Sequence, residues 1–193
     1  MAPSRHAKQL RRETERGTAS AEEQWLLGGL HERGEEGVTQ DNVKASSLFR
    51  RAADRGHLTA HINLSRCYDR GHGVEQSRSL AVEWLRKGAD LGSAGAQFAI
   101  GKRFARGHYV KKDLPLGKMY LELCAAHGRH ASASLDAVAL LRELRKCVAC
   151  GKLDVHHMIC SRCRNVRYCD AACQLRHWNS PADPHTLHCS PRR

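Results

Sequence analysis

The chain has 193 residues, a formal net charge of +12, 27% charged residues and only 5% aromatic residues. This length allows one ordinary domain with a small module beside it. The composition favours thin helical layers over a thick aromatic core or a disordered chain. The sequence contains no run of about 18 apolar residues, the length that could cross a membrane, and no apolar run that resembles a secretory signal. We therefore expect a soluble protein of the cytoplasm or nucleus that is not secreted and has no membrane partner.

Residues 1–20 contain several arginines together with Glu13 and Glu15. We expect this basic segment to be disordered; a transit peptide to an organelle is the weaker alternative, because such peptides contain few acidic residues. Basic residues are spread along the whole sequence with no run of five. The net charge alone therefore does not identify a nucleic-acid-binding tract.

The following segment repeats itself with a period of 36 residues. Six columns of residues agree in type or size at this shift. They are Val38, Val74 and Val110; Ala45, Ala81 and Gly117; Leu48, Trp84 and Tyr120; Phe49, Leu85 and Leu121; Ala53, Ala89 and Ala125; and Gly56, Gly92 and Gly128. Such agreement predicts a stack of equivalent units.

Each unit is predicted to contain two helices. In the first helix, apolar residues such as Leu64 and Tyr68 recur at helical spacing before Gly71, and in the second they recur before Gly92. The segment Gly71-His72-Gly73-Val74 supplies the turn between them.

Two residue types within the units could be mistaken for metal ligands. His72 and His108 recur in the turns, where we expect them to be loop residues. Cys67 and Cys124 fall in helical patterns, where we expect small buried thiols.

This pattern resembles the Sel1-like repeat, a relative of the tetratricopeptide repeat, from about residue 22 to residue 130. The resemblance implies a mainly α fold, a short α-solenoid of helix-turn-helix repeats that either holds partner proteins or displays the rest of the chain. The first unit departs from the pattern, because its turn from Gly34 to Gly37 is one residue longer and Glu32 replaces the aromatic residue.

Residues 132–145 are predicted to form one more amphipathic helix through Leu135, Val138, Leu141 and Leu144. We expect this helix to cap the stack, so that the repeat region covers residues 21–145.

Seven of the nine cysteines lie in the last 47 residues, in closely spaced pairs. In a chain that is not secreted, such spacing favours metal over disulfides. The possible ligands are Cys147, Cys150, Cys160, Cys163, Cys169, Cys173, His185 and Cys189. Because a structural Zn²⁺ takes four sulfur or nitrogen ligands, this series predicts two structural zinc ions.

Residues 147–189 resemble the MYND finger through these pairs and through Tyr168-Cys169, Cys173-Gln174 and His177-Trp178. Ligand pairs interleave in that family. The resemblance therefore implies that Cys147, Cys150, Cys169 and Cys173 hold one ion, while Cys160, Cys163, His185 and Cys189 hold the other. Spacing alone also allows sequential sites, with the first four cysteines forming a zinc ribbon. Residues 190–193 form a tail.

The eighth ligand is the least regular part of the pattern. Typical members place this histidine about three residues after the tryptophan, whereas here residues 179–184 and their two prolines come before His185. We interpret this segment as a four-residue insertion in an irregular loop. His177 is the rival, because a helix starting at Asp170 would place it one turn after Cys173. We prefer His185.

The same short helix would place Gln174 and Trp178 one turn apart, on a face rotated about 100° from the zinc ligands. MYND fingers that bind proline-rich peptides have a glutamine and a tryptophan at these positions, and a serine that corresponds to Ser161. The resemblance therefore implies a peptide-binding site at Ser161, Gln174 and Trp178. The alternative is that Trp178 packs inside the finger.

These features predict a zinc-binding interaction or scaffold protein with protein partners, and no catalytic residues. Zinc with four protein ligands has no open position for a substrate. MYND fingers also occur in lysine methyltransferases, but the repeats leave no room here for their cofactor domain. An adaptor of a ubiquitin ligase or of a transcriptional regulatory complex is the main alternative, although no F-box-like segment fits. Nucleic-acid binding is less favoured.

Overall fold

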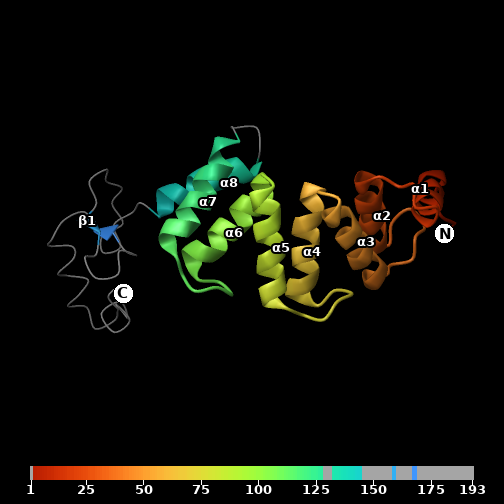
Figure 1. Cartoon of the computed structure of the whole chain (residues 1–193), viewed down its shortest axis with the longest axis horizontal. Helices are drawn as coiled ribbons and strands as arrows, with labels where there is room; N and C mark the ends of the chain where they lie inside the picture. Colours follow the sequence, from red (N-terminus) through yellow and green to blue (C-terminus); the bar gives the residue numbers. More distant parts are fainter. Residues whose placement is uncertain (1, 128–131, 145–157, 160–166, 169–193) are drawn as a thin grey trace.

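The computed structural model describes residues 2–127, 132–144, 158–159 and 167–168, and in this part of the chain almost all regular structure is helical (Figure 1). The helices are α1 (Arg5–Glu15), α2 (Ala21–Arg33), α3 (Asn42–Asp54), α4 (Leu58–Arg70), α5 (Arg78–Asp90), α6 (Ala94–Arg106), α7 (Leu114–Ala126) and α8 (Ser132–Glu143). Two short strands, β1 (Met158–Ile159) and β2 (Arg167–Tyr168), pair in antiparallel orientation. The predicted mainly α fold is confirmed.

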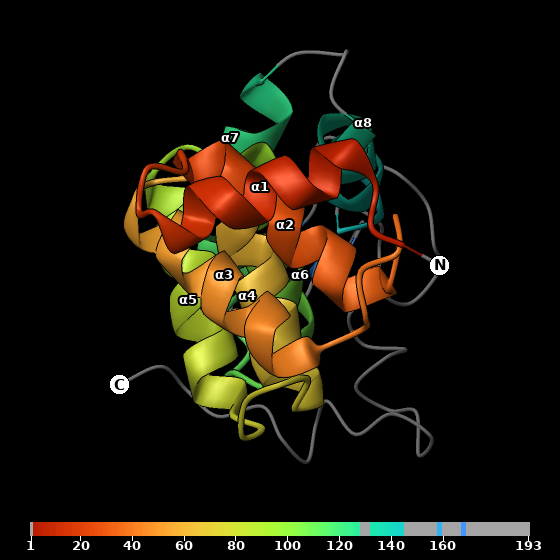
Figure 2. The ribbon, with the colours of Figure 1, turned by 90° about the vertical axis from the view of Figure 1, so that its right-hand side faces the viewer.

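The helices form three antiparallel pairs, α2 with α3, α4 with α5, and α6 with α7, and each pair packs on the next (Figures 1 and 2). We call α2, α4 and α6 the first helices and α3, α5 and α7 the second helices. The core runs through the stack, with Phe49, Leu64, Leu85, Ile100 and Leu121 almost fully buried. Each pair therefore buries its apolar faces largely against its neighbours.

Capping residues set the helix boundaries. The first helices end at Gly34, Gly71 and Gly107, all with left-handed backbone, a conformation that glycine adopts without strain. The second helices begin at Asp41, Ser77 and Asp113, whose side chains accept a hydrogen bond from the backbone N–H three residues later. These N-caps form a further repeat column at the same 36-residue period.

The expectation of a disordered N-terminus is wrong. Residues Arg5–Glu15 form α1, which packs on α2 and buries Ala7 and Leu10. Ser4 caps the helix by accepting a hydrogen bond of 2.9 Å from the backbone N–H of Ala7. Two apolar residues one turn apart are enough to dock a short helix when the adjacent stack offers an apolar face.

The interpretation of the first unit also needs a correction. Counting back from the left-handed cap Gly34, the position of Tyr68 and Phe104 is taken by His31, which is 5% exposed, rather than by Glu32. The extra residue lies after the cap, where the turn contains Glu36 with a positive φ of 52°. The helix therefore keeps its packing register and the turn absorbs the insertion.

Helix α8 exists as predicted, and Leu141 and Leu144 of the predicted stripe pack against α7, but the first half of the stripe does not. Ser134 and Ala137 are buried, and the Ser134 hydroxyl donates to the Cys124 carbonyl at 2.8 Å. Leu135 and Val138 are 55% and 41% exposed, although the predicted apolar stripe contained both. Small residues of α8 face α7, and their size allows the two helices to pack closely.

The other expectations for the repeats are confirmed. His72 and His108 lie in exposed turns, and Cys67 and Cys124 are buried. None of the helices in the described ranges has the length and apolar character needed to cross a bilayer.

Close packing between α6 and α7 gives a stability test. An added Cβ at Gly117 would lie 2.7 Å from the backbone nitrogen of Ala105, which cannot move aside cheaply, whereas at Gly95 it would meet only the flexible end of Ile62. Helix propensity favours Gly→Ala by about 1 kcal/mol at either site. We expect Gly117→Ala to lower the free energy of unfolding by about 1–2 kcal/mol and Gly95→Ala to leave it unchanged or raise it, as measured by urea denaturation. Equal effects would contradict the packing argument.

Candidate functional site

The predicted zinc ligands and peptide-binding residues all lie outside the described residues. They are Cys147, Cys150, Cys160, Ser161, Cys163, Cys169, Cys173, Gln174, Trp178, His185 and Cys189, and the rival ligand His177 is outside as well. These assignments stay predictions. Within residues 147–189 the structure describes only β1 and β2.

The antiparallel pairing of β1 and β2 determines at which end of the ladder the chain enters and leaves the two strands. Met158 pairs with Tyr168 and Ile159 with Arg167. The chain therefore enters β1 and leaves β2 at the same end of the ladder, next to the pair Met158–Tyr168. The segment with Cys147 and Cys150 leads into this end, and Cys169 directly follows it.

The opposite end of the ladder belongs to the connection between the strands. Cys160 directly follows Ile159, and Cys163 lies in the same connection. The cysteines themselves lie outside the described residues, so the grouping of the ligands stays a prediction.

The part of the chain that the structure describes contains no group of three or more His, Cys, Asp or Glu residues placed to hold a metal. Its two cysteines are unsuited to the role. Burial raises the pKa of Cys67 to about 11 and also raises the pKa of Cys124. Metal binding needs the thiolate, which a raised pKa disfavours.

The first helices carry a second feature of interest, a group of exposed cations near their C-terminal ends. We call it the basic face and define it by Arg66 and Arg70 of α4 and Lys102 and Arg106 of α6, all of them exposed. Arg66 and Arg70 line a hollow of about 460 Å³ that also includes His72. Lys102 and Arg106 line another, of about 520 Å³, that includes His108.

Two ion pairs connect neighbouring first helices at this level. The Arg66 guanidinium of α4 lies 3.5 Å from the Glu32 carboxylate of α2. Arg103 of α6 forms hydrogen bonds to both carboxylate oxygens of Asp69 on α4, and both side chains are mostly buried. The acidic residues between the helices are thus neutralised from within the stack. Sequence analysis missed this arrangement, although its signal, Arg-x3-Arg-Gly-His against Lys-x3-Arg-Gly-His, recurs at the 36-residue period.

Comparison with known families agrees with both parts of the chain. The Sel1 repeat matches residues 24–57, 58–93 and 94–128, and the MYND finger matches residues 147–189. The chain is also 42% identical over 50 residues to ubiquitin carboxyl-terminal hydrolase 19 of Arabidopsis thaliana, a match that covers 26% of this chain but only 7% of that protein.

Solved structures with the same fold include bacterial repeat proteins. The Sel1 repeat protein of Oxalobacter formigenes is 27% identical with a TM-score of 0.64, covering 77% of this chain and 56% of that one. The protective antigen c5321 of uropathogenic Escherichia coli, which displays an SLR fold, is 35% identical with a TM-score of 0.58, covering 64% of this chain and 26% of that one. The chain thus spans only part of each of these proteins.

Counting reactive thiols separates ligands from buried cysteines. In the zinc-loaded chain we expect none of the nine cysteines to react quickly with a thiol reagent at pH 8. A chelator should make the seven cysteines in residues 147–189 reactive, because removing the metal leaves them as free thiols. Cys67 and Cys124 should react only after denaturant is added. Absorbance of the released chromophore gives the count. Rapid reaction of Cys67 in the native chain would contradict its burial.

Proposed function

The chain belongs to the Sel1 repeat family and carries a C-terminal MYND finger, and from this premise we propose that it is a non-enzymatic scaffold whose finger binds short proline-rich peptides of partner proteins. The observation that carries the proposal is the joining of the two modules, with repeats over residues 24–128 and the finger over residues 147–189. Both kinds of module mediate protein–protein interactions. The peptide class is the finer part of the proposal.

Zinc would hold the finger together. Seven thiols and one imidazole supply the eight donors that two tetrahedral ions require. Filled coordination shells would leave no position for a substrate, so the ions are structural. The match to the MYND finger supports the interleaved grouping, with the first and third cysteine pairs on one ion and the second pair with His185 and Cys189 on the other.

Peptide binding would use the face of the finger that the metal ligands leave free. Trp178 offers a flat apolar ring and Gln174 an amide one helical turn away, with Ser161 beside them in the family pattern. A proline-rich segment is already extended and loses little conformational entropy on docking. One stacked ring and a few hydrogen bonds can therefore give a specific contact of modest affinity.

Two other functions have weaker support. The similarity to a ubiquitin hydrolase covers a small fraction of that enzyme, and it suggests a shared module rather than a shared activity. The alternative of an adaptor for a ubiquitin ligase or a transcriptional complex agrees with the module content but needs a partner-binding observation. Either role would use the same finger.

Ligand variants test which residues bind zinc. We expect elemental analysis of the purified chain to give two zinc ions, and His185→Ala to lose or strongly weaken one, because a structural site with three ligands holds zinc poorly. His177→Ala is the matched control and should retain both. The reverse pattern would assign the eighth ligand to His177, and full zinc retention by Cys173→Ser would remove Cys173 from the ligand set.

A tryptophan variant tests the peptide site. We expect Trp178→Ala to weaken binding of a proline-rich peptide about thirtyfold or more, since loss of a central aromatic anchor costs about 2 kcal/mol, while both zinc ions stay bound. Gln174→Ala should cost less. Isothermal titration with zinc analysis of each variant measures both effects. Loss of zinc in Trp178→Ala would instead make the ring part of the finger's core.

A further inference from the structure

The basic face repeats with the fold, which sets it apart from ordinary surface charge. Arg66 and Arg70 of α4 are one helical turn apart and lie on one face, and Lys102 and Arg106 occupy the same positions of α6. Each pair is followed by a left-handed glycine and an exposed histidine, so two successive units present the same charged group.

Of the four cations on this face, only Arg66 forms an ion pair with a carboxylate in the described part of the chain. Glu32 and Asp69 are already paired with Arg66 and Arg103. In the described part of the chain, no ion pair to a carboxylate involves Arg70, Lys102 or Arg106. Positive potential is therefore left over along α4 and α6, over two hollows that could take a ligand.

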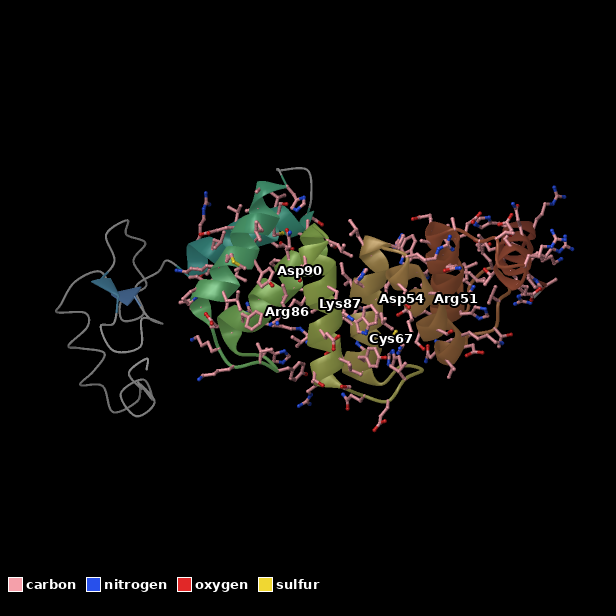
Figure 3. All side chains as sticks on the ribbon, in the orientation of Figure 1. Arg51, Asp54, Cys67, Arg86, Lys87 and Asp90 are labelled. Atoms are coloured by element: carbon pink, nitrogen blue, oxygen red, sulfur yellow. The ribbon has the colours of Figure 1, made fainter. Side chains whose placement is uncertain are left out.

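Stabilisation of the helix ends is the plain explanation for Arg70 and Arg106, because cations in the last turn complement the helix dipole. That explanation applies equally to Arg51 of α3 and Lys87 of α5, which also lie in last turns (Figure 3). It does not account for the second cation one turn earlier or for the hollows. The second helices therefore offer a built-in comparison.

The spacing between units indicates what could bind. The ion pair between Arg103 and Asp69 shows that α4 and α6 are neighbours at this level, and packed helices lie about 8–10 Å apart. An extended peptide advances about 3.1–3.3 Å per residue. Two carboxylates about three residues apart would thus reach the cations of two successive first helices.

We propose that the basic face is a second binding site, which takes an extended acidic segment of a partner protein with carboxylates about three residues apart. This proposal goes beyond the proposed function, because the site lies on the repeats and does not use the finger. A nucleic-acid backbone is the other anionic occupant, and the test below distinguishes it from an acidic peptide.

The test uses the full zinc-loaded chain and a labelled, proline-free peptide, Glu-Ser-Gly repeated four times. Fluorescence anisotropy should show binding that the double variant Arg70→Gln/Arg106→Gln weakens about tenfold, because two exposed charge pairs are lost. The matched control is Arg51→Gln/Lys87→Gln, which removes two last-turn cations from the second helices and should change affinity less than twofold. Equal losses in the two variants would overturn the site as mere attraction to net charge.

Further arms distinguish the other outcomes. The peptide with Gln in place of Glu should not bind, and Trp178→Ala should bind the acidic peptide normally even if it loses the proline-rich one. Loss of the acidic peptide in Trp178→Ala would place its site on the finger and overturn the proposal. Tighter binding of a twelve-nucleotide single strand, lost in the same double variant, would make the face a nucleic-acid surface instead. If the double variant fails to fold, Lys102→Gln provides the test, with a smaller loss expected.

Discussion

The packing of each helix pair on the next is the interaction on which the rest of the fold depends, and a contact between successive first helices recurs within it. Trp25 of α2 stacks on His57 at the start of α4, with ring centroids 4.9 Å apart. Ile62 of α4 contacts the start of α6 at Gly95, and Phe98 of α6 packs in the cluster that includes residues of α8. These three residues occupy equivalent positions, so one contact is used three times.

The same contact explains the end of the stack. The buried Ala137 of α8 corresponds to the buried Ile100 of α6. With this alignment, Leu135 takes the place of Phe98 and Val138 takes the place of Gly101. Gly101 is covered by α7, whereas among the described residues α8 has no second helix and no further first helix. Leu135 and Val138 are exposed because no described helix covers them. Helix α8 thus takes the place of a first helix at the end of the described stack.

Sequence predicted the parts of the fold that repetition makes visible. Columns such as Phe49, Leu85 and Leu121 recur because each unit buries the same position, and glycines recur where a left-handed cap is required. The errors fell where repetition fails. A fixed shift of 36 residues assigned Glu32 to the place of His31, because the longer turn after Gly34 moves the preceding helix one residue out of that shift.

The remaining errors have similar physical origins. Helix α1 has no repeat partner, so two buried residues gave no periodic signal. Periodicity in α8 identified an apolar stripe, but contact with α7 selects small residues, and Ser134 satisfies a backbone carbonyl there. In the finger, the predicted ligands rest on spacing and the chemistry of zinc. Their grouping depends on three-dimensional topology, which spacing does not determine.

A scaffold with two peptide sites gains more from their connection than from either site alone. Helix α8 ends at Glu143 and the finger begins at Cys147, so only a few residues separate them. A partner bound at the basic face would hold a nearby proline-rich motif at an effective concentration of about millimolar at the finger, provided its own linker spans the gap. Two weak contacts would then together give tight binding. The exposed cations of the basic face and the single aromatic anchor of the finger would thus be sufficient for selective binding of one partner. Salt would weaken the acidic contact first, because its charges are exposed, and the finger's contact would outlast it.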